Sequence, residues 1–443
     1  MSEMSVSVVG VGRLGAPLAA CLASKGYSVV AADTDAAKVA ALSRGDAPVR
    51  EPGLPEMLQE HRGRVRATSD IGEAVRESEI TFIVVPTPSE EDGEFSLRHV
   101  LAVCAPIGRA LRDKGGFPVV VLTSTVMPGA TGGAVREALE AASGRRCGRE
   151  FGLCYSPEFI ALGSVIRDML SPDFILIGES DPRSGDRLAA LYGTLCDNSP
   201  PVARMNFVNA ELAKLAVNTY VTTKISYANM LAGLCERLPE ADVDVVTSAL
   251  GLDGRIGRKY LKGATRYGGP CFPRDNVAFA RLARRLGARA PLAEATQEIN
   301  REHGAALAQV ALSRLPPGGT VGILGLSYKP ETDVVTESAG VDVAGRLAAA
   351  GVRVVAYDPA GMANARTVLG DQVHFAASAA ECARASDVLV ITTPWEEFQR
   401  LSFGASPDGT APRAVIDCWR VLRPAQREGM AEYIVPGTGP TRS

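Results

Sequence analysis

The residue best suited to covalent chemistry is Cys271, which stands in the string Arg266-Tyr-Gly-Gly-Pro-Cys-Phe-Pro-Arg-Asp275. Free cysteines are usually buried apolar residues, and that interpretation fits the other eight. The paired glycines before Cys271 and the prolines on both sides of it instead indicate a backbone shaped around a ligand. We therefore expect a rigid, loop-borne thiol that acts as a nucleophile, with Asp275 four residues beyond it.

A second group of polar residues interrupts a long apolar stretch. Lys214 and Asn218 are four residues apart, so on a helix they share a face, and Glu211 lies three residues before Lys214 on the same polar stripe. An ammonium and an amide in this arrangement can stabilise an oxyanion. The alternative is a solvent-exposed helix face, and the pair gains weight only beside a nucleophile such as Cys271.

A third group is a glycine loop with the spacing GxGxxG, placed between an apolar strand and an alanine-rich helix. Glycines at these positions let the backbone and the helix N-terminus approach a pyrophosphate. The next strand ends in Asp33, where a carboxylate accepts hydrogen bonds from a ribose and repels a 2′-phosphate, so NAD is favoured over NADP. A tight turn with a capping aspartate is the disfavoured alternative. The cofactor-binding loop comprises Gly10, Gly12, Arg13, Leu14 and Gly15.

The elements around these residues form two nucleotide-type units separated by helices. Strands predicted at 5–9, 28–32, 80–85, 118–122, 152–155 and 174–177 alternate with helical segments, a pattern typical of a mostly parallel, doubly wound sheet. A long helix follows at about 208–236, and shorter helices are expected at 242–250, at 277–286 and from about 292. A second strand–loop–helix–strand unit opens at Thr320, with its strands at 321–324 and 352–356, its loop at 325–330 and its helix near 341–350.

Length and composition exclude several classes of protein. The 443 residues suit two or three domains, and 46% hydrophobic with 22% charged residues is typical of a soluble globular protein. A net charge of −3 does not favour nucleic-acid binding, and we expect neither a signal peptide nor a membrane span. Nine scattered cysteines without a CxxC pair and four isolated histidines predict no metal site and a reduced, cytoplasmic protein.

At the Cys271 string the chain resembles the UDP-glucose and GDP-mannose dehydrogenase family, and the resemblance covers nearly the whole length. Its other blocks follow in order along the chain: GVGRLG at the N-terminus, PTPS at 86–89, STVMPG at 124–129, SPEF at 156–159, KLAVNT at 214–219, RIG at 255–257 and GLSYKPETD at 325–333. So many ordered blocks make coincidence negligible.

The resemblance implies an α/β fold in which two Rossmann-like, doubly wound parallel-sheet domains are joined by a central helical region with a long spine helix. Residues 1–205 would bind NAD, 206–300 would form the central dimerisation domain, and 301–443 would bind the UDP of a nucleotide sugar. The implied reaction is an NAD-dependent four-electron oxidation of the sugar C6 alcohol through a thiohemiacetal and a thioester on Cys271. The implied partners are the nucleotide sugar and a second copy of the chain, and the product would serve polysaccharide biosynthesis.

The resemblance also assigns roles residue by residue. Cys271 would be the nucleophile, Lys214 and Asn218 would stabilise the oxyanion, and Asp275 would activate water or take a proton. Thr125 and Glu158 would line the reaction centre. The cofactor would also contact Thr87, Ser89, Thr125 and Arg274. The substrate would contact Phe159, Lys214, Asn218, Arg255, Tyr260, Tyr267, Gly268, Gly269 and Lys329.

Three departures from the family pattern bear on function. Leu162 stands where UDP-glucose members carry an acid that assists thioester hydrolysis, Arg274 replaces a lysine, and an arginine expected shortly after Asp333 is missing. UDP-glucose is the best single substrate, with UDP-N-acetylglucosamine, UDP-N-acetylmannosamine or GDP-mannose as alternatives. Two other readings stay open: a β-hydroxyacid or 6-phosphogluconate-type dehydrogenase, which has no use for Cys271, and a non-catalytic protein that binds NAD or a nucleotide sugar.

Overall fold

The computed structural model describes residues 4–401, 412–427 and 430–441. The chain divides into two compact units, Met1–Ala216 and Val217–Ser443. The division falls inside the long helix α9 (Phe207–Cys235), which was expected at about 208–236. The predicted three-part division of the chain at residues 205 and 300 stays a prediction.

The first unit is built on an eight-stranded sheet with the order β3-β2-β1-β4-β5-β6-β7-β8. Neighbouring strands are parallel except for the antiparallel pair β6–β7. Apolar side chains from both faces enter two separate core clusters, so helices cover both sides, as near-continuous apolar strands require. The strands are β1 (Ser5–Val9), β2 (Ser28–Ala32), β3 (Val65–Thr68), β4 (Ile80–Ile83), β5 (Val119–Leu122), β6 (Gly152–Tyr155), β7 (Ile175–Glu179) and β8 (Val202–Met205). The helices are α1 (Gly15–Ser24), α2 (Ala36–Arg44), α3 (Leu54–Glu60), α4 (Ile71–Arg76), α5 (Arg98–Arg112), α6 (Arg136–Ser143), α7 (Val165–Leu170) and α8 (Pro182–Leu195).

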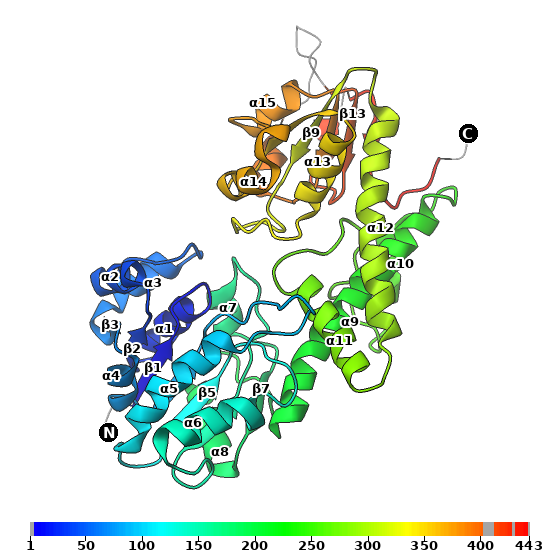
Figure 1. Ribbon diagram of the computed structural model, residues 1–443. Coiled ribbons are helices and arrows are strands. Elements are labelled where there is room, and N and C mark those ends of the chain that lie inside the picture. The colour runs from blue at the N-terminus through cyan, green and yellow to red at the C-terminus, as the bar shows by residue number, and fades with distance from the viewer. Residues whose placement is uncertain (1–3, 402–411, 428–429, 442–443) are drawn as a thin grey trace. The chain divides into compact units, whose positions relative to one another are not determined.

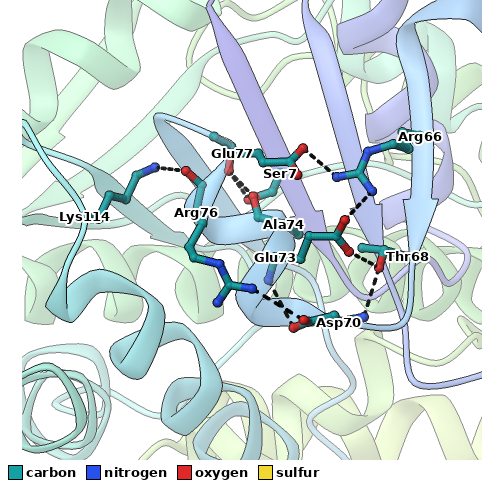
Figure 2. Close-up of polar contacts among 10 residues, drawn as sticks. Ser7, Arg66, Thr68, Asp70, Glu73, Ala74, Arg76, Glu77 and Lys114 are labelled. Atoms are coloured by element: carbon teal, nitrogen blue, oxygen red, sulfur yellow. Dashed lines mark hydrogen bonds and ion pairs between the residues drawn. The ribbon is translucent and has the colours of Figure 1, made fainter.

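The edge strand β3 is tied to helix α4 by side-chain contacts, which Figure 2 shows. Arg66 pairs with Glu73 at 2.8 Å and with Glu77 at 2.6 Å, and the Thr68 hydroxyl donates to Glu73 at 2.6 Å. Asp70 caps α4 by accepting a hydrogen bond from the Glu73 amide at 3.0 Å. Exposed ion pairs stabilise a protein only modestly, but here several of them join an edge strand to its neighbouring helix.

The second unit begins with the C-terminal part of α9 and continues through helices into a six-stranded sheet with the order β11-β10-β9-β12-β13-β14. All strand pairs in this sheet are parallel. The predicted pair of doubly wound sheets with a helical region between them in sequence is therefore confirmed (Figure 1). The strands are β9 (Thr320–Leu324), β10 (Arg353–Tyr357), β11 (His374–Phe375), β12 (Val388–Ile391), β13 (Ala414–Asp417) and β14 (Tyr433–Ile434). The helices are α10 (Val243–Leu250), α11 (Phe272–Arg285), α12 (Pro291–Arg314), α13 (Ala339–Ala349), α14 (Met362–Leu369), α15 (Ala379–Arg384) and α16 (Pro424–Arg427).

The two units share a close contact between two glycines, which lies where the first strand of each sheet leads into the next helix. A Cβ on Gly15 would come within 1.8 Å of the Gly10 carbonyl oxygen, and a Cβ on Gly340 would come within 1.9 Å of the Gly325 carbonyl oxygen. In each unit a glycine that ends the first strand therefore touches a glycine in the following helix. The interval between them is five residues in the first unit (15 − 10) and fifteen in the second (340 − 325).

No helix among the described residues is long and apolar enough to cross a membrane. The described chain likewise brings together no group of three or more His, Cys, Asp or Glu side chains that would hold a metal ion.

Candidate active site

The glycine loop of the first unit fits the pyrophosphate of NAD. A Cβ on Gly12 would meet no protein atom within 4 Å, so this side of the loop is open space. No side chain caps the N-terminus of α1, which leaves its amides for an anion. Asp33 stands at the end of β2, where its carboxylate accepts the Val11 amide at 2.8 Å and stays 11% exposed. These are the features that a dinucleotide with a free 2′-hydroxyl requires.

The loops after β4 and β5 are pinned to each other. The Thr87 hydroxyl donates to the Thr125 carbonyl oxygen at 2.7 Å, and the Ser124 hydroxyl donates to the Val85 carbonyl oxygen at 2.6 Å. Thr87 is buried, whereas Ser89 is exposed and forms an isolated β-bridge with Phe95. Thr87 and Thr125 thus lie together, and Thr87 holds the backbone of Thr125 in place.

Glu158, Phe159 and Lys214 form a compact group in the first unit. The Lys214 ammonium donates to the Glu158 carbonyl oxygen at 2.5 Å and lies 4.5 Å from the centroid of the Phe159 ring. The Tyr192 hydroxyl donates to the Glu158 carboxylate at 3.4 Å. Burial raises the pKa of Glu158 to about 7, against the opposing effect of the Lys214 charge. A carboxyl group that titrates near neutrality is suited to proton transfer.

Glu211 does not share the polar stripe that its spacing predicted. Its carboxylate is fully buried and accepts the Gly129 and Thr131 amides at 2.6 and 2.7 Å. Burial raises its pKa. Both carboxylate oxygens of Glu211 therefore accept hydrogen bonds from the turn that follows β5, and Glu211 holds that turn in place.

Cys271 lies in the second unit, and the structure corrects its predicted setting. Helix α11 begins at Phe272, not near residue 277, so Cys271 is the N-cap of a helix instead of the middle of a loop. Pro273 was interpreted as a loop residue, but proline is favoured in the first turn of a helix, and Asp275 in that turn suits the helix dipole. The positive end of a helix favours a thiolate.

Exposure separates Cys271 from the other cysteines. All nine cysteines belong to the described residues, and of them Cys271 alone is exposed. Burial raises the pKa of Cys21, Cys104 and Cys382 to about 12. A thiol must ionise to act as a nucleophile, so Cys271 is the cysteine suited to covalent chemistry.

Asp275 and Asn218 lie beside the start of α11. Asp275 is 1% exposed, and its carboxylate accepts the Asn218 side-chain amide at 2.6 Å, with the Arg274 Nε at 3.6 Å. An amide carries two N–H groups. Asp275 therefore orients the Asn218 side chain through one of these N–H groups.

The segment from Tyr267 to Gly269 differs from the prediction in part. Gly269 has φ +84°, and a Cβ on it would lie 2.7 Å from the Tyr328 ring, so no other residue fits there. The Tyr267 side chain is 4% exposed and donates from its hydroxyl to Gln297 at 2.6 Å. Gly268 and Gly269 thus shape the backbone next to Cys271, whereas the Tyr267 ring packs into the helices.

The other predicted substrate residues lie in two places of the second unit. Arg255 is 88% exposed and pairs with Asp253 of its own turn at 2.6 Å. Tyr260 has φ +63° and makes an edge contact with Phe272, the neighbour of Cys271. Lys329 is half-buried in the loop between β9 and α13.

One residue that holds the site was missed by the sequence reasoning. The buried Glu51 carboxylate accepts the Gly163 and Val165 amides, both at 2.8 Å, and so fixes the loop after Glu158. Pro52 and Gly53 predict a turn next to Glu51, but no local sequence pattern indicates that Glu51 binds the Gly163 amide, 112 residues away. Leu162, in the same loop, packs against the apolar core of the first sheet.

Models of known protein families match three segments of the chain. The NAD binding domain of the UDP-glucose/GDP-mannose dehydrogenase family matches residues 4–196, the central domain of that family matches 208–302, and its UDP binding domain matches 322–424.

Known proteins match over most of the chain. UDP-glucose 6-dehydrogenase AglM of Haloferax volcanii is 35% identical over 96% of this chain and 99% of its own length. GDP-mannose 6-dehydrogenase of Azotobacter vinelandii is 34% identical over 80% of this chain and 81% of its own. The structure of a UDP-glucose dehydrogenase from the hyperthermophilic archaeon Pyrobaculum islandicum superposes with a TM-score of 0.88 at 36% identity, covering 98% of this chain and 97% of that one.

Proposed function

Because the chain belongs to the UDP-glucose/GDP-mannose dehydrogenase family and is an NAD-dependent nucleotide-sugar 6-dehydrogenase, we propose that it converts UDP-glucose to UDP-glucuronate. The observation that carries the proposal is Cys271, the one exposed thiol of nine, at the N-terminus of a helix and beside the Asp275–Asn218 pair. Neither a hydroxyacid dehydrogenase nor a binding protein needs this arrangement.

The proposed reaction removes four electrons from C6 of the sugar. The primary alcohol loses a proton and a hydride and becomes an aldehyde, and the Cys271 thiolate adds to its carbonyl carbon to give a thiohemiacetal. Loss of a second hydride gives a thioester, which water cleaves to the carboxylate and the free thiol. NAD, when bound, accepts the hydrides, so two molecules are reduced for each sugar. The covalent sulfur link keeps the aldehyde bound between the two oxidations.

The groups around the reacting carbon would have distinct tasks. The Lys214 ammonium and the second N–H of Asn218 stabilise the oxyanion of the thiohemiacetal. Glu158, with its pKa raised by burial to about 7, takes the proton of the water that cleaves the thioester. In this assignment Glu158 takes over the task of the acid that is missing at position 162, where the Leu162 side chain packs against the core.

The nucleotide of the substrate would bind in the second unit, at the loop between β9 and α13 that contains Lys329. The match of residues 322–424 to a UDP binding domain supports a nucleoside diphosphate at this loop, and the 35% identity to a UDP-glucose 6-dehydrogenase favours UDP. The 34% identity to a GDP-mannose 6-dehydrogenase keeps GDP-mannose as the second candidate.

We further propose a homodimer formed through α9. Exposed apolar side chains recur along this helix at seven-residue intervals, at Tyr220, Tyr227 and Leu234, with Met230 between them. Such a repeat is typical of a helix that packs against another. Sedimentation equilibrium of the purified protein would then give twice the chain mass, and a chain mass alone would contradict the dimer. The proposed compartment is the cytoplasm, where a catalytic thiol stays reduced.

The decisive experiment measures NADH formed per sugar consumed with UDP-glucose, UDP-N-acetylglucosamine, UDP-N-acetylmannosamine and GDP-mannose. We expect UDP-glucose to give the highest kcat/KM and two NADH per sugar. Cys271→Ser should lower kcat by at least about 1,000-fold, whereas the matched change at the buried Cys104 should not. Turnover of a small hydroxyacid by Cys271→Ala, or no turnover of any nucleotide sugar by the wild type, would contradict the proposal.

A further inference from the structure

The backbone before Cys271 is held on one side by the helices of the second unit. The Tyr267 amide donates to the Asn300 side chain at 2.8 Å, and the Asn300 side-chain amide donates back to the Tyr267 carbonyl oxygen at 3.0 Å. The Ala264 amide donates to Asn229 at 3.0 Å. Asn229 and Asn300 are both buried, on α9 and α12. This side of the segment is therefore anchored to rigid elements.

The other side of the same segment touches the loop between β9 and α13. The Gly269 amide donates to the Thr336 carbonyl oxygen at 2.9 Å. A Cβ on Gly268 would lie 2.2 Å from the Glu337 carbonyl oxygen, so the two backbones meet without space for a side chain. Glu337 itself has φ +51°, a backbone conformation that residues other than glycine adopt only at a cost in free energy. The segment that leads to Cys271 thus rests directly on the proposed nucleotide loop.

A buried cation joins the two segments more firmly. The Arg266 side chain is 8% exposed, and its guanidinium pairs with Glu337 at 2.6 Å and with Asp342, in the first turn of α13, at 3.3 Å. A Cβ on Gly304 of α12 would lie 2.3 Å from the Asp342 carboxylate, so the helix leaves just enough room for this group. A buried charge needs its partners, because an uncompensated one is strongly unfavourable. Movement of Glu337 or Asp342 must therefore displace Arg266.

We propose that Arg266 is a positioning residue, which makes the placement of Cys271 depend on whether a nucleotide occupies the loop from Leu326 to Ser338. The inference rests on the proposed function, because it takes that loop as the nucleotide site. Arg266 is five residues before Cys271. Between them, the backbone at Gly268 and Gly269 packs directly against Glu337 and Tyr328, so a shift of Arg266 reaches Cys271 through the backbone. Nucleotide bound to the loop holds Glu337, Glu337 holds Arg266, and the thiol is set at its working position.

The test removes the charge of Glu337 without changing its shape. Glu337 is half-exposed, so Glu337→Gln should fold. We expect kcat with UDP-glucose to fall by about tenfold while KM changes less than about twofold, because chemistry and not binding is affected. Glu432→Gln is the matched control. Like Glu337, Glu432 pairs with an arginine, in its case Arg314 at the end of α12, at 2.8 Å. It should leave both constants unchanged.

A second readout separates positioning from simple stabilisation. The rate at which iodoacetamide alkylates Cys271, followed by mass spectrometry of its peptide, should change at least about threefold when UDP is added to the wild type or to Glu432→Gln. In Glu337→Gln and Arg266→Met that response should disappear, while Arg266→Lys, which keeps the charge, should retain part of it.

Calorimetry of UDP binding distinguishes two kinds of failure. If UDP binds and its effect on alkylation is the same in the wild type and in Glu337→Gln, Arg266 has no positioning role although the proposed function stands. If the wild type neither binds UDP nor oxidises UDP-glucose, the inference falls together with the proposed function.

Discussion

The two sheets of this protein begin with the same glycine–glycine contact, but the loops that this contact closes differ in length and content. Both have the same order of their first strands, and in both a glycine at the end of the first strand touches a glycine in the next helix. In the first unit the four residues between them form a short loop that leaves the helix N-terminus open to a pyrophosphate. In the second the interval of fifteen residues carries side chains such as Lys329 and Glu337. Shortening the loop exposes the helix N-terminus, and lengthening it supplies specific contacts.

The acid at the end of the second strand shows the same divergence. Asp33 accepts two backbone amides and remains 11% exposed, so its carboxylate is accessible to a ligand. Asp358 is 1% exposed and accepts six hydrogen bonds, among them those of the Leu326 and Ser327 amides and of Trp395. The same position therefore keeps an accessible carboxylate in the first unit and holds the long loop in the second.

The largest effects should come from the paired glycines. Gly15→Ala and Gly340→Ala each force a methyl group against a carbonyl oxygen at under 2 Å, and overpacking of this kind costs about 3 kcal/mol or more. Gly15→Ala should abolish NADH binding, and Gly340→Ala should abolish UDP binding, as measured by fluorescence and calorimetric titration. Retained UDP affinity in Gly340→Ala would show that the second loop is not built like the first.

Gly12→Ala is the control for this pair of substitutions. Because no protein atom lies within 4 Å of the added methyl group, the melting temperature should stay the same. NADH affinity should still fall by at least about tenfold, since the methyl group enters the space of the pyrophosphate. Unchanged NADH affinity would place the cofactor elsewhere.

Smaller effects should separate the two aspartates. Asp358→Asn places an amide where six donors converge, and we expect a loss of about 2 to 4 kcal/mol in the free energy of unfolding, measured by urea titration. Asp33→Asn should change stability little and lower the preference for NAD over NADP by about tenfold, as the ratio of kcat/KM values. If Asp33→Asn were as unstable as Asp358→Asn, both aspartates would have a structural role, and the two units would not differ at this position.

The last effect depends on pH and belongs to the first unit alone. The folded pKa of Glu158, raised by burial from 4.5 to about 7, means that the native state binds the proton more tightly than the unfolded state does. Relative to Glu158→Gln, the free energy of unfolding should therefore fall as pH rises from about 4.5 to about 7, by up to ~3 kcal/mol. Urea titrations at several pH values would measure this, and UDP affinity in the second unit should not follow it. Parallel curves for wild type and Glu158→Gln would show that Glu158 has an ordinary pKa.

Local patterns predicted those parts of the molecule that local forces determine. The strands β1, β2 and β6 begin and end where their apolar runs do, and the second strand–helix–strand unit lies at its predicted place. The start of α11 was wrong because Pro273 is compatible with both a loop and a first helical turn. Ion pairs and caps such as Arg266–Glu337 and Glu51–Val165 join residues 71 and 114 positions apart, and no local pattern specifies such partners.

The contact between Gly325 and Gly340 closes the ends of the long loop whatever its contents, so the entropy of closing it is already met by the fold. We expect that the residues between these glycines, here called the cassette, can be exchanged as one segment without rebuilding the sheet. Arg266 lies outside the cassette but pairs with Glu337 inside it. A transplanted cassette should therefore work only when its matching partner at position 266 is transplanted with it.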